Sequence, residues 1–227
     1  MSRSSEAADT RSSAHAFEPN AECPLCPRLS DYRLTSRAAN PGWFNAPVPS
    51  FGNLDAAVLI VGLAPGLRGA NRTGRPFTGD FAGMLLYRTL LDFGLAQGTY
   101  GAAADDGLTL VDCRVSNAVR CVPPGNLPTP LEIGTCNRFL TTEIAAMKRL
   151  RGVLALGGTA HAAVLRASGI RPAHVAFRHG EIHALPQGRL LADSYHVSRL
   201  NTNTGRLTEV MFRTVVEVLL GRIGPLS

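Results

Sequence analysis

The stretch that decides the fold begins with the apolar run Val58-Leu59-Ile60-Val61, continues as Gly62-Leu63-Ala64-Pro65-Gly66, and ends with Asn71-Arg72-Thr73-Gly74-Arg75-Pro76-Phe77-Thr78-Gly79-Asp80. A short β-branched run predicts a buried strand, and dense glycine and proline predict a shaped loop. Active sites of open α/β sheets collect at the carboxyl ends of the strands, so we expect this loop to form a pocket wall. The loop supplies one aromatic ring, Phe77, and one carboxylate, Asp80.

Apolar runs alternate with helical patterns along the rest of the chain. Strands are expected near 56–61, 114–119, 153–156 and 190–194, with a further short strand at 181–185, and helices near 81–93, 129–149, 159–167 and 202–220. The second of these helices opens with a capping box, Thr129-Pro130-Leu131-Glu132. Such alternation is typical of βαβ units. We therefore expect an α/β fold: a three-layer α/β/α sandwich around a central, mostly parallel, four-stranded sheet.

Length, composition and charge indicate how many domains the chain forms and which class of partner it binds. A chain of 227 residues, 45% hydrophobic and 18% charged, is long enough for one domain, which we place at 23–227. The polar, Ser/Ala-rich residues 1–22 predict a disordered arm without an export signal. The formal net charge of +6 favours a polyanionic partner such as nucleic acid. No apolar run is long enough for a membrane span. We expect a cytoplasmic, nucleoid-associated protein that is a monomer.

Five cysteines are an odd number for a disulfide framework in a chain without an export signal. Cys23-Pro24-Leu25-Cys26 can hold one corner of a metal site, and Cys121 with Cys136 can complete a set of four thiolates. Four thiolates suit either zinc or an iron–sulfur cluster, and the residues alone leave both open. Cys113 lies at an expected strand, and we interpret it as a small core residue.

Three polar residues stand where predicted strands or loops end. Asn117 carries a donor and an acceptor that match the imide edge of a pyrimidine, although it could simply end its strand. His196 follows the strand at 190–194 and is expected at the pocket edge. Asp80 precedes a helical pattern, where Asp is a common N-cap, and capping alone would explain it. Both roles can coexist.

The amino-acid sequence of these segments resembles that of the uracil-DNA glycosylase superfamily, in particular its family 5 branch. The resemblance rests on Gly62–Gly66, Asn71–Asp80, the segment around Asn117, and His196-Val197-Ser198-Arg199-Leu200, which is similar to the superfamily's H-P-S-x-L motif. Val197 stands where proline is common. Most of the superfamily has its active carboxylate or amide at the position of Leu63, whereas family 5 has an apolar residue there and uses the Asp that ends the loop.

The resemblance implies a monofunctional glycosylase that flips uracil out of DNA and hydrolyses its N-glycosidic bond, starting base excision repair. It implies catalytic roles for Asp80, Asn117 and His196. Phe77 would stack on the base, Leu200 would be the wedge that fills the stack, and Ser198 would contact phosphate. Close backbone approach to the substrate is implied for the remaining positions, which are Gly62, Ala64 and Gly66.

The resemblance also implies a structural [4Fe–4S] cluster on Cys23, Cys26, Cys121 and Cys136, and double-stranded and single-stranded DNA containing uracil as substrates, with other deaminated bases accepted. The main alternative is a non-catalytic iron–sulfur or zinc module that binds DNA. A nucleotide-binding enzyme is a further alternative, weakened because the glycine-rich loop lacks the Lys-Ser/Thr ending of a P-loop. The single lysine, Lys148, lies elsewhere.

Overall fold

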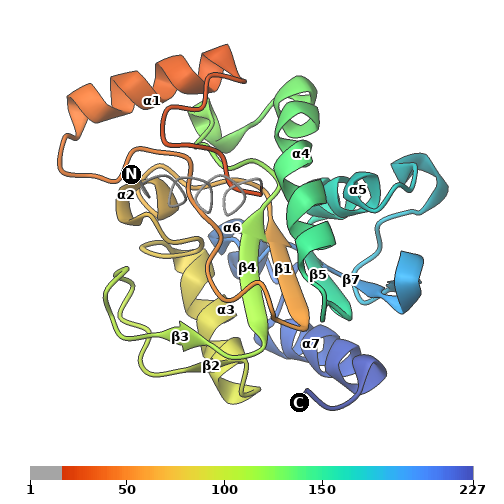
Figure 1. Cartoon of the computed structure of the whole chain (residues 1–227). Helices are drawn as coiled ribbons and strands as arrows, with labels where there is room; N and C mark the ends of the chain where they lie inside the picture. The colour runs from red at the N-terminus through yellow and green to blue at the C-terminus, as the bar shows by residue number, and fades with distance from the viewer. Residues whose placement is uncertain (1–16, 227) are drawn as a thin grey trace, which may run out of the picture.

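A five-stranded sheet forms the centre of the molecule (Figure 1), whose computed structural model describes residues 17–226. The strand order is β4 (Cys113–Asn117), β1 (Val58–Gly62), β5 (Gly152–Leu156), β7 (Leu190–Ser194) and β6 (Ile182–Ala184). The first four strands are parallel, and β6 pairs antiparallel with β7 at the edge. The predicted α/β sandwich is confirmed, and the short strand expected at 181–185 adds a fifth, antiparallel member to the expected four.

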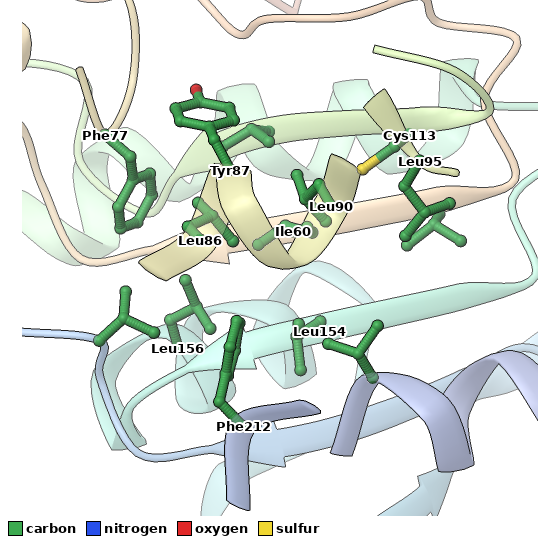
Figure 2. Packing of buried hydrophobic residues seen from close by; sticks show 14 of the residues in the cluster. Ile60, Phe77, Leu86, Tyr87, Leu90, Leu95, Cys113, Leu154, Leu156 and Phe212 are labelled. Atoms are coloured by element: carbon green, nitrogen blue, oxygen red, sulfur yellow. The ribbon is translucent and has the colours of Figure 1, made fainter. Parts of the chain in front are cut away.

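Helices cover both faces of the sheet, which explains why β1 is apolar throughout. Val58 and Ile60 pack with α3 (Phe81–Asp92) and α7 (Glu209–Ile223), as Figure 2 shows around Ile60. Leu59 and Val61 pack on the other face with α4 (Pro130–Ala146) and α5 (Gly158–Ala167). Successive side chains of a strand point to opposite faces, so a strand covered on both sides needs an apolar residue at every position.

The helix α1 (Pro27–Ala39) was not predicted from the sequence. Its buried residues are Leu29, Arg33 and Ser36, which follow helical spacing, but two of the three are polar. A search for apolar periodicity therefore misses it. The other small elements are α2 (Ala70–Thr73), the hairpin of β2 (Ala96–Gln97) and β3 (Thr109–Leu110), and the 3₁₀ turns η1 (Pro124–Asn126), η2 (Pro172–His174) and η3 (Pro186–Gly188).

The expected single helix at 202–220 is wrong at its start. Two helices occupy this region, α6 (Arg199–Asn203) and α7, which begins only at Glu209. Gly205 between them adopts a left-handed conformation with φ of 69°, which a continuing helix does not allow. Thr208 then caps α7 by accepting a hydrogen bond from the Met211 N–H at 3.1 Å.

Of the expected disordered arm, residues 1–16 lie outside the described residues, whereas 17–22 are placed. Glu18 accepts hydrogen bonds from the Ser50 N–H at 3.0 Å and from Arg114 Nη2 at 3.1 Å. The expected disorder therefore does not extend to Glu18. Among the described helices, none combines the length and the apolar character required to cross a membrane.

Candidate functional site

A pocket opens at the carboxyl edge of the sheet, where β1, β4 and β7 end. It brings together six residues that the sequence predicted, namely Ala64, Gly66, Phe77, Asp80, Asn117 and His196. Pro65, Ala70 and Ala82 complete its lining, and the sequence offered no separate signal for these small residues beyond their place in the loop. The loop, Asn117 and His196 thus meet at this edge of the sheet, as the sequence predicted.

Gly62 lies behind the pocket and is absent from its described lining. A Cβ atom at this position would come within 2.4 Å of Phe77 Cζ and 2.5 Å of Asn117 Oδ1. Only glycine therefore lets the Phe77 ring and the Asn117 amide approach the end of β1 together. Gly62 thus supports these two side chains, and its contact with substrate stays a prediction.

The Phe77 backbone is held in a left-handed conformation, with φ of 51°, that is uncommon for a bulky residue. Two hydroxyl groups fix it. Tyr87 Oη donates to the Pro76 carbonyl at 2.6 Å, and Tyr100 Oη donates to the Phe77 carbonyl at 3.2 Å. The ring is therefore set in place by its surroundings rather than by local preference.

The Asn117 side chain is buried, with 2% of the residue exposed. Its amide makes no hydrogen bond to any described residue. Buried polar groups in proteins are nearly always paired, so an unpaired amide in a pocket wall is a candidate ligand-binding group. It offers a donor and an acceptor side by side.

His196 also lines the pocket, and its ring lies 6.1 Å from that of Phe77, centroid to centroid. Burial lowers the pKa of His196 below its usual value, and the Asp80 charge offsets only part of this effect. The imidazole is therefore neutral at neutral pH. Asn201 Nδ2 donates to the His196 carbonyl at 2.8 Å and steadies this loop, in which Val197 is fully buried.

Asp80 is both a helix cap and a pocket residue. Its Oδ1 accepts from the Gly83 N–H at 3.3 Å, as the N-cap of α3. Its Oδ2 lies against Gly66 and Gly69, where added Cβ atoms would come within 3.3 and 2.5 Å of it. The two oxygens thus have different neighbours, so the roles of helix cap and catalytic carboxylate are compatible in Asp80.

Ser198 and Leu200 lie outside the described lining of the pocket. The Ser198 hydroxyl caps α6 by accepting from the Asn201 N–H at 3.4 Å. Leu200 is 71% exposed on the first turn of α6. A leucine that packed against the last helix would be buried, so that alternative does not apply to Leu200.

The four predicted ligand cysteines line one small cavity beside the β4 edge of the sheet. Arg33 Nη1 donates to Cys121 Sγ at 3.7 Å, and the Arg120 N–H donates to Cys136 Sγ at 3.4 Å. Among the described residues, no three of the cysteine sulfurs all lie within 4.8 Å of one another. Tetrahedral zinc with Zn–S bonds of 2.3 Å would bring all four to about 3.8 Å separation.

The surroundings of these thiols are mostly apolar. Burial raises the pKa of the Cys26 thiol to about 11 and that of Cys121 to about 12. Iron or zinc ions would supply the positive charge that stabilises the thiolates. Arg33 is buried beside them, and its Nε has no hydrogen-bond partner among the described residues. Sequence reasoning missed Arg33, because a buried arginine on a helix leaves no apolar pattern.

Cys113, by contrast, lies in the core between the sheet and α3 and is 1% exposed. Figure 2 shows its sulfur near Leu95, among carbon side chains. Burial raises the pKa of its thiol. Its expected role as a small core residue is confirmed.

Comparison with known proteins identifies the family. The model of the "Uracil DNA glycosylase superfamily" matches residues 49–220. A type-5 uracil-DNA glycosylase of Thermus thermophilus is 46% identical over 200 residues, covering 86% of this chain and 90% of that protein. A type-5 enzyme of Pyrobaculum aerophilum is 43% identical over 201 residues, covering 87% and 86%.

A type-4 uracil-DNA glycosylase, also of Pyrobaculum aerophilum, is 31% identical over 169 residues, covering 74% of this chain and 70% of that protein. Identity to the two type-5 relatives is thus higher and extends over more of the chain. The resemblance that the motifs indicated is confirmed. The chain belongs to the uracil-DNA glycosylase superfamily.

Proposed function

We propose that this protein is a monofunctional uracil-DNA glycosylase, which hydrolyses the N-glycosidic bond of uracil in DNA and so starts base excision repair. One observation carries the proposal beyond family membership. Asn117, His196 and Asp80 meet around a single pocket, where neither the Asn117 amide nor the His196 ring is hydrogen-bonded to a described residue. Such groups are free to bind a ligand.

The base must leave the helix before it can enter this pocket, because its glycosidic bond is unreachable within the stack. In the pocket, Phe77 would stack on the face of the base. Asn117 would bind the pyrimidine edge through its paired donor and acceptor. Ala64 and Gly66, which line the pocket, would let the backbone lie close to the base.

Bond cleavage leaves the bonding electron pair on the base and positive charge on the sugar. Neutral His196 would stabilise the negative charge on the base by hydrogen bonding, as oxyanion-hole donors do. Asp80 would stabilise the cationic sugar or position the water that adds its hydroxyl to the sugar, the proton passing to the base. Both roles need the ionised carboxylate in the position that the α3 cap fixes.

The abasic product should stay intact, because cutting the strand requires an amine that forms a Schiff base. The only lysine, Lys148, lies between α4 and β5, close to the amino end of β5, whereas the pocket is at the carboxyl ends. Its Nζ donates to the Ala145 carbonyl at 3.1 Å. Its position supports a monofunctional enzyme.

We further propose a structural [4Fe–4S] cluster held by Cys23, Cys26, Cys121 and Cys136. The chemistry of four thiols around one cavity fits it, and the wide sulfur spacing favours a cluster over one zinc ion. Arg33, which donates to Cys121 Sγ, also keeps an Nε without a hydrogen-bond partner among the described residues. When bound, it would supply a cross-link joining the start of α1, the segment after β4, and α4.

Leu200 and Ser198 would act on the DNA rather than on the base. The exposed Leu200 would enter the gap left by the flipped base. Ser198 would contact a phosphate while capping α6. Double-stranded and single-stranded DNA containing uracil are the proposed substrates, and the accepted bases would extend to other deaminated bases.

The test is to incubate the purified protein with uracil-containing duplex DNA and to measure free uracil and strand integrity. We expect free uracil and an intact abasic strand. DNA binding without base release would instead favour a non-catalytic module. Borohydride trapping of a covalent adduct that Lys148→Ala abolishes would contradict the monofunctional mechanism.

A further inference from the structure

A second group of potential ligands lies at the β7–β6 edge of the sheet, away from the cysteines. His161 on α5, His183 on β6 and Asp193 on β7 each offer one ligand atom, and these atoms all lie within 4.8 Å of one another. His161 Nδ1 lies 2.8 Å from Asp193 Oδ1, and His183 Nε2 lies 2.9 Å from Asp193 Oδ2. The side chains of Asp193 and His161 are 0% and 3% exposed, and that of His183 is 16% exposed.

The proton inventory of His161 shows that this group needs a cation. Its Nε2 lies 3.0 Å from the Val175 carbonyl, which can only accept a hydrogen bond, so Nε2 carries the proton. In a neutral imidazole, Nδ1 then presents a lone pair to the Asp193 carboxylate, which also has only lone pairs. Two such atoms at 2.8 Å repel unless a cation joins them. That cation is either an extra proton on His161 or a metal ion.

The second imidazole favours the metal ion. A proton between His161 and Asp193 needs no third group, whereas a metal ion needs several ligands, and His183 Nε2 is placed to be one. The outer contacts also match those of metal sites. His161 donates its other N–H to a carbonyl, and the Arg178 N–H donates to Asp193 Oδ2 at 3.2 Å, which leaves Oδ1 for the ion.

We propose that His161 Nδ1, His183 Nε2 and Asp193 bind a divalent transition-metal ion of the zinc class, with water as a fourth ligand. Two imidazoles and one carboxylate are a common zinc donor set. With bonds of about 2.0–2.2 Å, the ligand atoms would stand about 3.3–3.6 Å apart, so His161 Nδ1, which lies 2.8 Å from Asp193 Oδ1, would move outward by about 0.5–0.8 Å. The ion would join α5, β6 and β7 just before the chain reaches His196.

The experiment uses the iron-loaded, full-length protein after dialysis against a chelator. Zinc is added, unbound ion is removed, and zinc and iron are measured per chain in the same sample. The variant His183→Gln removes one ligand at a partly exposed position, and folding is checked by circular dichroism. His174→Gln is the matched control, because His174 is exposed on η2 and belongs to no such group.

We expect one zinc per chain in the native protein and in His174→Gln, with unchanged iron. In His183→Gln, zinc affinity should fall at least tenfold. Zinc in hundredfold excess over the Kd of the native protein should raise Tm by about 5–10 °C in the first two proteins and by at most about half as much in His183→Gln. Equal zinc uptake by His183→Gln, no uptake by the native protein, or uptake matched by loss of iron would overturn the proposal, leaving a proton between His161 and Asp193.

Discussion

Ser116 and Asn117 are neighbours at the end of β4, both buried and both polar, yet their surroundings differ completely. Ser116 Oγ donates to Glu143 Oε2 at 2.8 Å and accepts from Ser50 Oγ at 3.1 Å. The Asn117 amide has no partner among the described residues and lies in the pocket wall. Alternation along the strand sends one side chain into the structure and the other to the site.

Ser116 belongs to a buried network of charged side chains, in which every member is hydrogen-bonded to another. Glu143 is fully buried on α4 and accepts from Arg114 Nε and Arg120 Nη2, each at 2.7 Å. Burial by itself raises the pKa of Glu143, but the charges of Arg120 and Arg114 outweigh it and hold the pKa below its usual value. The charged groups of this network are thus paired with each other, whereas the Asn117 amide has no partner among the described residues.

The largest expected effect is on stability and comes from the buried network around Glu143. Glu143→Gln leaves the buried Arg114 and Arg120 with only the more exposed Glu18 as an acidic partner among the described residues, so we expect the free energy of unfolding to fall by about 3–5 kcal/mol. Denaturant titration measures it. The exposed Glu209→Gln at the start of α7 is the control and should change little. A fall of less than about 1 kcal/mol in the free energy of unfolding of Glu143→Gln would contradict the structural role given to this network.

On the pocket side, Asp80→Asn should reduce base release at least about 100-fold in single-turnover assays, because the charge that stabilises the transition state is lost. Folding and DNA binding should persist, since Asn is an equally good N-cap. The control is Asp105→Asn, which removes an exposed carboxylate outside the pocket lining. Near-native release by Asp80→Asn would reduce Asp80 to a cap.

A smaller effect concerns the exposed Leu200. Without the wedge, flipping must bear the full unstacking cost, so Leu200→Ala should slow uracil release from duplex DNA about tenfold. Release from single-stranded DNA should change little. Val210→Ala, an equally exposed site at 72% on α7, provides the control. An equal loss on both substrates would point to pocket damage instead.

The smallest expected effect is the pH dependence that His196 contributes. Its pKa is lowered by burial, so below about pH 6.5 the unfolded chain binds more protons at this residue than the folded chain does. Stability is therefore lost as the pH falls through that value toward the lowered pKa. Tm measured at about pH 7.5 and 5.5 should fall less in His196→Gln than in the native protein. An identical fall would contradict a buried, neutral imidazole.

Much of the fold could be predicted because its signals are local. The apolar run at β1 indicates a strand covered on both faces, and the capping box at Thr129 marks the start of α4; the structure has both of its hydrogen bonds. The pocket residues could be placed because parallel strands end at one edge of the sheet. Their individual roles remain predictions.

What could not be predicted depends on contacts between distant residues. Glu18, Arg114 and Glu143 meet from three separate segments, and no spacing in the sequence indicates that they pair. The helix α1 was not predicted because its buried face includes Arg33, whose contacts come from other segments of the chain. The antiparallel pairing of β6 and the break at Gly205 depend on how the chain reaches the sheet edge and on one backbone angle.

The most direct test of the contrast is Asn117→Ala, with uracil release, affinity for undamaged DNA and the free energy of unfolding measured on the same preparation. We predict that release from duplex DNA falls at least about tenfold, as loss of a buried hydrogen-bonding group to the base would cause. Affinity for undamaged DNA should hold, because it rests on phosphates, and unfolding should change by less than about 1 kcal/mol. Unchanged release, or a stability loss as large as that of Glu143→Gln, would contradict the assignment of Asn117 to the base rather than to the fold.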